Sequence, residues 1–318
     1  MTEKKVILDL DTGVDDALAL AYAIANPTID LIGVISSYGN NTQVQTTENS
    51  LKLIDLFKED IPVYPGANHP SGVDDFQVMP VSKQIHGDNG IANLTLPIPT
   101  HSPAPLAGSD FLIQAVHQYG KNLTYIPTGP LTNLAIALKK DPEIANLIGH
   151  ITLMGGALTV EGNVTEAAEA NIYQDPEAAN IVFTAGFPLT MVGLDVTLRT
   201  LLTKKETAKW RRLGSRASKF YADLTDFYID AYADLDIDKQ GCALHDPLAV
   251  SVAIDPTFIS TISLPMKVVT KGDNYGRTIG DKSRLMNKTD VAEVATNVDA
   301  ERFLNSFMDE MTNFLVNF

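Results

Sequence analysis

The feature that most limits the fold of this chain is a repeated order of short apolar runs and longer amphipathic segments through its first two thirds. The apolar runs predict strands at residues 5–10, 30–36, 123–126, 150–154 and 189–192. The amphipathic segments predict helices at residues 14–25, 42–57, 131–139 and 176–185. Strands that alternate with helices are typical of crossover connections. We therefore predict an α/β fold, an open and mostly parallel central sheet with helices on both faces.

The last third of the chain follows a different pattern, and nothing in it marks a domain boundary. The sequence predicts helix at residues 203–232, strands at 266–270 and 276–281, and a closing helix at 299–316. Because there is no repeat, low-complexity tract or linker, we predict one domain over residues 1–318. Residues 66–107 and 234–245 are irregular, and loops this long in a compact domain are often functional. We expect them to form walls or lids of a site.

The charge balance restricts the possible partners. The net charge is −15 and no cluster of Lys and Arg opposes it, so we expect binding neither to nucleic acid nor to a membrane. The apolar stretches are interrupted well before the ~20 residues that a membrane-spanning helix needs. Residues 1–5 lack a signal-peptide pattern, and the lone Cys242 suits a reducing compartment. We expect a cytoplasmic protein.

Four aspartates follow the first predicted strand within eight residues: Asp9, Asp11, Asp15 and Asp16. Residues two apart in a strand share a face, so Asp9 and Asp11 should project together, while the other two fall in the first turn of a helix. Helix capping explains one or two acidic residues at such a position. Four close carboxylates raise one another's pKa or require a cation. At the carboxyl end of a parallel strand, where ligands bind, a hard divalent metal is the better interpretation.

Two known motifs with closely spaced aspartates fit this segment poorly. An EF-hand calcium loop that began at Asp9 would need Gly at its sixth position and Glu at its twelfth, where the chain has Val14 and Leu20. The haloacid dehalogenase phosphatases also begin with a strand that ends in Asp-x-Asp, which DLDTG resembles. Their later acidic motif has no counterpart in GDKSRL or GDNYGR. A metal-dependent phosphatase is therefore a weaker alternative.

The segment from Asp9 to Asp16 resembles the opening motif Asp-x-Asp-x-Gly-x-Asp-Asp of the nucleoside hydrolases, the inosine-uridine-preferring ribohydrolase family. Further segments follow in that family's order: SYGN, IPVYPGA, IHGDNGI, PTGPLTNLA, MGGA, GNVTEAAEAN and HDPLAV. Together these segments cover most of the chain. The resemblance implies hydrolysis of the N-glycosidic bond of ribonucleosides to ribose and a free purine or pyrimidine base, in nucleoside salvage.

The resemblance also implies a cofactor. Carried over residue by residue, it gives Ca²⁺ bound by Asp11, Asp16, the backbone carbonyl of Thr128, and Asp246. Calcium takes 6 to 8 oxygen ligands, so an all-oxygen set suits it. Taken alone, Asp246 before Pro247 is better explained as a helix N-cap with Pro in the first helical position. The family pattern and the neighbouring histidine favour the metal role.

The resemblance assigns further residues to the ribose. Asp15 would hold ribose hydroxyls, and Asn40, Glu169 and Asn171 would complete the sugar pocket with Met154 packed nearby. Carboxylates and amides there would stabilise the positive charge that develops on the sugar as the bond breaks.

Proton transfer requires a base and an acid. Asp11 is implied as the general base that acts on the attacking water, and His245 is our candidate for the acid that protonates the departing base. His86 would lie against the base or ribose. A lone histidine is more often structural than catalytic. Tyr228 and Tyr232, one helical turn apart, can line the base pocket, but a core aromatic pair explains them about as well.

The chain departs from the family pattern at two positions. Thr12 stands where the family commonly has Pro, and Ala170 stands where it often has Phe. Because the second change removes an aromatic surface near the substrate, it leaves the preferred base open and is the one feature that favours a non-catalytic nucleoside or sugar sensor. The resemblance further implies a homotetramer or homodimer.

Overall fold

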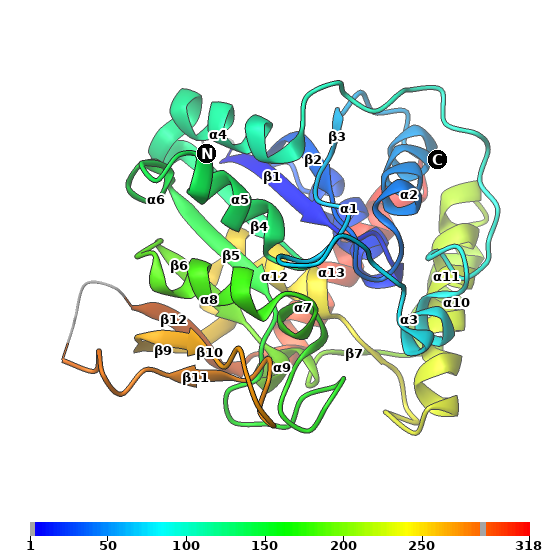
Figure 1. Ribbon diagram of the computed structural model, residues 1–318. Helices are drawn as coiled ribbons and strands as arrows, with labels where there is room; N and C mark the ends of the chain where they lie inside the picture. The colour runs from blue at the N-terminus through cyan, green and yellow to red at the C-terminus, as the bar shows by residue number, and fades with distance from the viewer. Residues whose placement is uncertain (1–3, 287–290) are drawn as a thin grey trace.

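The structure, a computed structural model, describes residues 4–286 and 291–318. In these residues an eight-stranded sheet runs through the molecule in the order β3-β2-β1-β4-β5-β6-β12-β9 (Figure 1). Its strands are β1 (Lys4–Leu10), β2 (Ile29–Ser36), β3 (Val63–Pro65), β4 (Leu123–Pro127), β5 (His150–Met154), β6 (Leu189–Val192), β9 (Ile259–Leu264) and β12 (Ala292–Val298). Neighbouring strands pair in parallel except β9, which is antiparallel to β12. The prediction of a mostly parallel sheet is confirmed.

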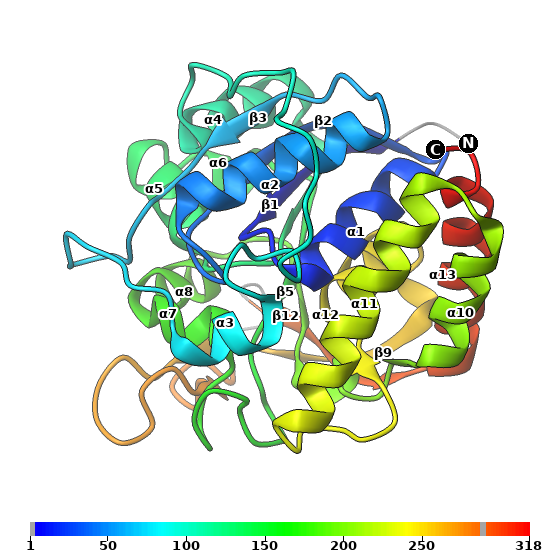
Figure 2. The ribbon, with the colours of Figure 1, turned by 90° about the vertical axis from the view of Figure 1, so that its right-hand side faces the viewer.

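Helices cover both faces of the sheet. One face carries α1 (Val14–Ala25), α2 (Gln43–Leu56), α10 (Lys204–Leu213), α11 (Arg216–Asp234), α12 (His245–Ile254) and α13 (Ala300–Leu315), and Figure 2 looks onto this layer. The other face carries α4 (Gly108–Tyr119), α5 (Thr132–Lys140), α6 (Ile144–Leu147) and α8 (Pro176–Thr184). Each layer closes its own hydrophobic core against the same sheet. The described chain is thus built around one sheet, as a single α/β domain.

Smaller elements complete the fold. They are α3 (Pro80–His86), α7 (Ala170–Gln174), α9 (Leu194–Thr197), the 3-10 helices η1 (Gly120–Asn122) and η2 (Pro256–Phe258), and two short antiparallel pairs, β7 (Leu201–Leu202) with β8 (Cys242–Ala243) and β10 (Met266–Val268) with β11 (Thr278–Gly280). In the described part of the chain, no helix combines the length and apolarity needed to cross a membrane.

Strand β1 shows how the sequence divides between the two cores. Val6, Leu8 and Leu10 join the core beneath α1, whereas Ile7 joins the core beneath α5. Successive side chains of a strand point to opposite faces, so a strand covered on both sides is apolar at nearly every position. This burial is why the parallel strands were recognisable as continuous apolar runs.

The sequence prediction left several elements of the fold unassigned, among them the helices α3, α4 and α12 and the sheet strands β3, β9 and β12. Helix α12 is buried along Leu248 to Val252 and packs against α1 and β5, so it lacks the solvent face that produces a helical pattern. Residues 66–107 contain only the short helix α3, and residues 234–245 contain only the end of α11, the pair strand β8 and the first residue of α12. Both stretches are mostly irregular, as expected.

Candidate active site

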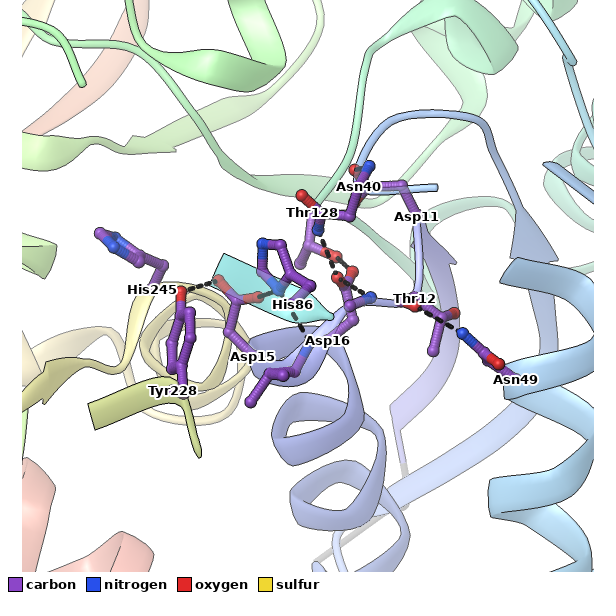
Figure 3. A network of polar contacts seen from close by, with 12 residues as sticks. Asp11, Thr12, Asp15, Asp16, Asn40, Asn49, His86, Thr128, Tyr228 and His245 are labelled. Atoms are coloured by element: carbon purple, nitrogen blue, oxygen red, sulfur yellow. Dashed lines mark hydrogen bonds and ion pairs between the residues drawn. The ribbon is translucent and has the colours of Figure 1, made fainter. Parts of the chain in front are cut away.

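The acidic motif lies where the strand order reverses. From β1 the sheet extends through β2 to β3 in one direction and through β4 to β6 in the other. In open α/β sheets, ligands bind in the crevice at the carboxyl ends of the strands at such a reversal. Asp11 follows β1, Asn40 follows β2, and Thr128 follows β4, so the topology brings the three together (Figure 3).

Three buried carboxylates converge in this crevice. Asp15, Asp16 and Asp246 each offer one oxygen, and these oxygens lie within 4.8 Å of one another. The first two begin α1, whereas Asp246 lies at the start of α12, far along the chain. The packing of α12 against α1 brings them together. A shared metal site requires this convergence.

Asp11 lies beside this group. Its Oδ2 accepts a hydrogen bond from the backbone N–H of Asn40 at 2.7 Å, and the Asn40 side chain donates to Asp16 at 3.1 Å. The hydroxyl of Thr128 also donates to Asp16, at 2.8 Å. By contrast, Oδ1 of Asp11 and Oδ1 of Asp15 are buried with no hydrogen-bond partner among the described residues. Two carboxylate oxygens are thus left open inside the protein.

Burial raises the pKa of every carboxylate in the crevice, and repulsion from neighbouring carboxylates raises it further for Asp11, Asp15 and Asp246. For Asp15 the pKa rises to about 8. Like charges buried together are stable in ionised form only if a cation balances them. Converging carboxylates with open, hard oxygen atoms fit a hard divalent cation.

Asp9 makes different contacts from the other aspartates of the motif. Its carboxylate accepts hydrogen bonds from the Tyr125 hydroxyl and from Nδ2 of Asn133, and burial raises its pKa to about 7. Its backbone carbonyl accepts a hydrogen bond from the N–H of Thr128 at 2.9 Å. Asp9 therefore ties the end of β1 to β4 and α5, and it holds the strand ends that carry the site.

The capping interpretation of Asp246 is wrong. Helix α12 begins at His245 after the N-cap residue Leu244, so Asp246 is the second helical residue and its carboxylate does not cap the helix. The same Asp-Pro pattern does mark a cap elsewhere: Asp175 accepts a hydrogen bond from the N–H of Ala178 at 3.0 Å at the start of α8. The sequence pattern alone does not separate the two cases.

His245 is held on both ring nitrogens. Nδ1 lies 2.7 Å from Oγ1 of Thr197, and Nε2 lies 2.8 Å from the hydroxyl of Tyr232. The Tyr232 hydroxyl lies 3.4 Å from that of Tyr228, which donates to Oδ2 of Asp15 at 3.3 Å. Burial lowers the pKa of His245 to about 4, so its imidazole is neutral near pH 7. A line of hydroxyls thus joins this histidine to the acidic cluster.

His86 enters the site from α3. Its Nδ1 accepts a hydrogen bond from the N–H of Val14 at 3.1 Å and lies 3.9 Å from Oδ1 of Asp15. Its ring packs 5.4 Å from the ring of Tyr228, centroid to centroid. Burial lowers the pKa of His86 to about 3, so it too is neutral near pH 7. The irregular stretch before α4 therefore contributes directly to the site.

The amides and carboxylate on the far side of the crevice brace one another. Glu169 caps α7 by accepting hydrogen bonds from the N–H groups of Asn171 and Ile172, and its Oε2 also accepts from Gly156. Nδ2 of Asn171 donates to the carbonyl of Thr128 at 2.6 Å. A carbonyl oxygen has two lone pairs, so that of Thr128 can accept this bond and still bind a cation.

These residues surround a cavity of about 520 Å³. Of the residues that the sequence predicted for the site, its lining contains Asp15, Asn40, His86, Thr128, Met154, Glu169, Asn171, Tyr228, Tyr232, His245 and Asp246. Asp11 and Asp16 are absent from the lining and lie deeper, with exposed fractions of 0%. The volume lies in the range of small-molecule sites.

Sequence reasoning missed part of this lining. Asn163 belongs to the segment GNVTEAAEAN, so a signal for it existed. Ile85 likewise opens the segment IHGDNGI, whereas Leu198 and Ile237 gave no signal, because an isolated apolar residue in a loop has no pattern. Ile85 comes from the irregular stretch 66–107 and Ile237 from 234–245, which confirms that both form walls of the cavity.

Comparisons with known proteins agree with this geometry. Residues 6–305 match the family model described as inosine-uridine preferring nucleoside hydrolase. The chain is 34% identical over 308 residues to the pyrimidine-specific ribonucleoside hydrolase RihA of Escherichia coli O8 (strain IAI1), covering 96% of this chain and 97% of that protein. Among solved structures, it is similar to a purine-preferring ribonucleoside hydrolase from Gardnerella vaginalis, with 51% identity, a TM-score of 0.98, and coverage of 99% and 100%. A plant nucleoside hydrolase, the PpNRh1 enzyme, gives 33% identity, a TM-score of 0.92, and coverage of 97% and 99%.

Proposed function

The chain belongs to the inosine-uridine preferring nucleoside hydrolase family, and from that membership we propose that it is a calcium-dependent enzyme that hydrolyses ribonucleosides to ribose and free base. The observation that carries the proposal is the convergence of Asp15, Asp16 and Asp246 beside a cavity of about 520 Å³. Structural carboxylates are saturated by donors, whereas Asp15 in this group and Asp11 beside it each leave one buried oxygen atom open.

In this proposal Asp11, Asp16, Asp246 and the carbonyl of Thr128 hold the cation. When bound, Ca²⁺ supplies positive charge that balances the carboxylates and lowers the pKa of a nearby water. The preference for calcium over a transition metal rests on the donor set, which is made only of oxygen atoms. The hydrogen bonds from Asn40 and Thr128 to the carboxylates fix their orientation before the cation arrives.

The polar wall of the cavity is suited to ribose. Asp15, Glu169 and the amides of Asn40 and Asn171 offer acceptors and donors for sugar hydroxyls, with Met154 packed against Asn171. As the N-glycosidic bond breaks, the sugar becomes oxocarbenium-like and carries positive charge. Buried carboxylates that are already in position stabilise this charge without reorganisation.

Asp11 is the proposed general base. Its Oδ2 is held by Asn40, whereas its Oδ1 is open to accept a proton from the attacking water. Burial and repulsion from Asp16 raise the pKa of Asp11 in the metal-free protein.

His245 is the proposed acid for the departing base. In its protonated form His245 would donate a proton to the departing base and return to the neutral imidazole, and the contact of Nε2 with the Tyr232 hydroxyl holds the ring in place. Tyr228 and His86 close the same end of the cavity and would lie against the base. The hydroxyls and imidazoles at this end provide donors for ring nitrogens and carbonyls of a base.

The decisive experiment is an incubation of the purified protein with a panel of ribonucleosides. Purine and pyrimidine ribonucleosides should both be included, because the relatives differ in the base that their names give. We expect release of ribose, measured as reducing sugar, and of the free base, measured by chromatography. This activity should be lost in excess chelator and restored by added Ca²⁺. Binding without ribose release in calorimetry would instead support the sensor. We further propose a cytoplasmic homodimer or homotetramer, which light scattering and fractionation would test.

A further inference from the structure

One wall of the cavity has almost no regular structure. Residues 155–169 connect β5 to α7, and residues 161–164 of this segment line the cavity. Glu169 is the N-cap of α7, and Asn171 lies in its first turn. Backbone N–H and C=O groups in such a segment need partners other than helix or strand neighbours. The side chains that provide these partners therefore fix the position of the segment at the edge of the cavity.

The N–H groups at the start of this wall are held by Asp195 of α9. Its carboxylate accepts from the backbone N–H of Leu158 at 2.9 Å and from that of Thr159 at 2.7 Å. The Thr159 hydroxyl donates to it as well, at 2.6 Å. One side of the wall is thereby anchored to the end of β6.

The carbonyls of the same wall are held by Arg277, which lies just before β11. Its Nη2 donates to the carbonyl of Leu158 at 2.8 Å, and its Nη1 donates to those of Val160 at 2.9 Å and Ala167 at 3.3 Å. The guanidinium therefore binds carbonyls from both ends of the loop and holds the two ends together. The Leu158 residue is held from opposite directions, by Asp195 on its N–H and by Arg277 on its carbonyl.

The hairpin that carries Arg277 is fixed in place. The N–H of Val268 in β10 donates to Oδ1 of Asn180 in α8 at 3.1 Å. Gly276, at a φ of +83°, packs so closely that an added Cβ would lie 2.8 Å from Cβ of Ala168. Thr278 exchanges hydrogen bonds with the backbone of Ala157. The loop thus rests on a rigid support.

We propose that Arg277 is a positioning residue for the substrate: it gathers the carbonyls of the loop and so sets Glu169 and Asn171 against the ribose. The link to these residues is direct, because Oδ1 of Asn163 in the loop accepts a hydrogen bond from the N–H of Ala170, between them, at 2.9 Å. Arg277 itself is absent from the cavity lining and acts through the loop. This proposal rests on the proposed function for its kinetic consequence.

An arginine is required by the geometry. A planar guanidinium presents several donors in a fixed arrangement and spans three carbonyls at once, whereas a lysine ammonium is a point donor on a flexible stem. The three residues that supply the carbonyls are partly exposed, so water can replace the lost contacts without unfolding. The effect of removing Arg277 should therefore be local.

The test compares three variants by steady-state kinetics and by hydrogen exchange of the whole protein. In Arg277→Ala we expect kcat/KM to fall by about 10- to 100-fold, mainly through a higher KM, because misplaced binding groups lose substrate before they lose chemistry. Exchange of the N–H groups of Gly162, Val164 and Ala170, which are bonded within the loop, should accelerate in the same variant. Arg277→Lys should lie between it and the original protein.

Arg284→Ala is the matched control. Arg284 also donates to a backbone carbonyl, that of Met266, in the same hairpin region, and it pairs with Asp281, whereas the hydrogen bonds of Arg277 go to the loop. It should leave both readouts unchanged. Unchanged exchange in Arg277→Ala, or equal losses in both alanine variants, would overturn the proposal. If the original protein hydrolyses no nucleoside, the proposed function fails, while the exchange measurement still decides whether Arg277 positions the loop.

Discussion

Two kinds of buried carboxylate lie within this molecule, and they differ in how fully hydrogen-bond donors of the protein surround them. Asp195 and Asp175 are both buried, and each accepts hydrogen bonds on both oxygens from backbone N–H groups and a hydroxyl. Asp11 and Asp15 are as deeply buried, yet each keeps one oxygen with no partner among the described residues and has carboxylates for neighbours. A saturated carboxylate anchors the backbone. One with open oxygens and like-charged neighbours costs stability unless a ligand completes it.

Substitution experiments can therefore distinguish carboxylates that act in the site from carboxylates that anchor the backbone. Substituting a site carboxylate should remove activity and relieve repulsion in the metal-free protein. Substituting an anchoring carboxylate should cost stability and leave the cation site intact.

Asp11→Asn should lower kcat by about 10³-fold, because it removes the proposed general base. In excess chelator the same variant should be at least as stable as the original protein, since one buried like charge is gone. Kinetics with a nucleoside and thermal unfolding followed by circular dichroism check the two parts. A variant that keeps full activity would remove Asp11 from the mechanism.

Asp246→Asn should abolish stabilisation by calcium. A ligand at 100 times its Kd stabilises a protein by about 2.7 kcal/mol, which corresponds to a shift of roughly 4 °C in Tm for a chain of 318 residues. Thermal unfolding with and without Ca²⁺ measures this shift. Asp175→Asn is the matched control and should retain it. If both variants keep the shift, Asp246 is not a ligand.

The metal-free protein should lose stability as pH rises. The pKa of Asp15 is raised from 3.8 to about 8 and that of Asp9 to about 7, so the folded state holds these protons more tightly than the unfolded state. Their contribution is complete below about pH 4 and is lost as pH rises through these values. In chelator we expect Tm to fall by roughly 5 °C between pH 5 and pH 8.5. Saturating Ca²⁺ should remove the part of the fall that comes from Asp15, and a fall of equal size with calcium present would argue against a cation among these groups.

Asp195→Asn should have the smallest effect of these variants. It should lower the stability of the protein, whereas Asp11→Asn in chelator should not. It weakens hydrogen bonds to two N–H groups of the cavity wall and should cost about 1 to 2 kcal/mol of unfolding free energy. Chemical denaturation measures this loss. The calcium shift should stay unchanged, because this carboxylate lies outside the acidic cluster. If Asp195→Asn also lost the increase in Tm caused by calcium, the cavity wall held by Asp195 would be coupled to the cation site.

Much of the fold was predictable from local pattern, and the exceptions have a common cause. The strands of the parallel sheet and the helices with one solvent face carry their periodicity in the sequence. Helix α12 does not, because residues 245–252 are buried throughout. Strand β12 carries Glu293 and Asn297 among its apolar residues and so lacks a continuous apolar run. Elements whose environment comes from distant segments leave a weak local signal.

Local pattern and motif order are enough to predict the mostly parallel sheet, the crowding of Asp11, Asp15 and Asp16 at the end of β1, and the family to which the chain belongs. The approach of Asp246 to Asp15 and Asp16, and the contacts of Arg277 with the cavity wall, become visible only in the folded chain. Periodicity and motif spacing depend on residues that are close together in the sequence. Contacts between segments far apart along the chain depend instead on how whole helices and hairpins pack, which no local pattern specifies.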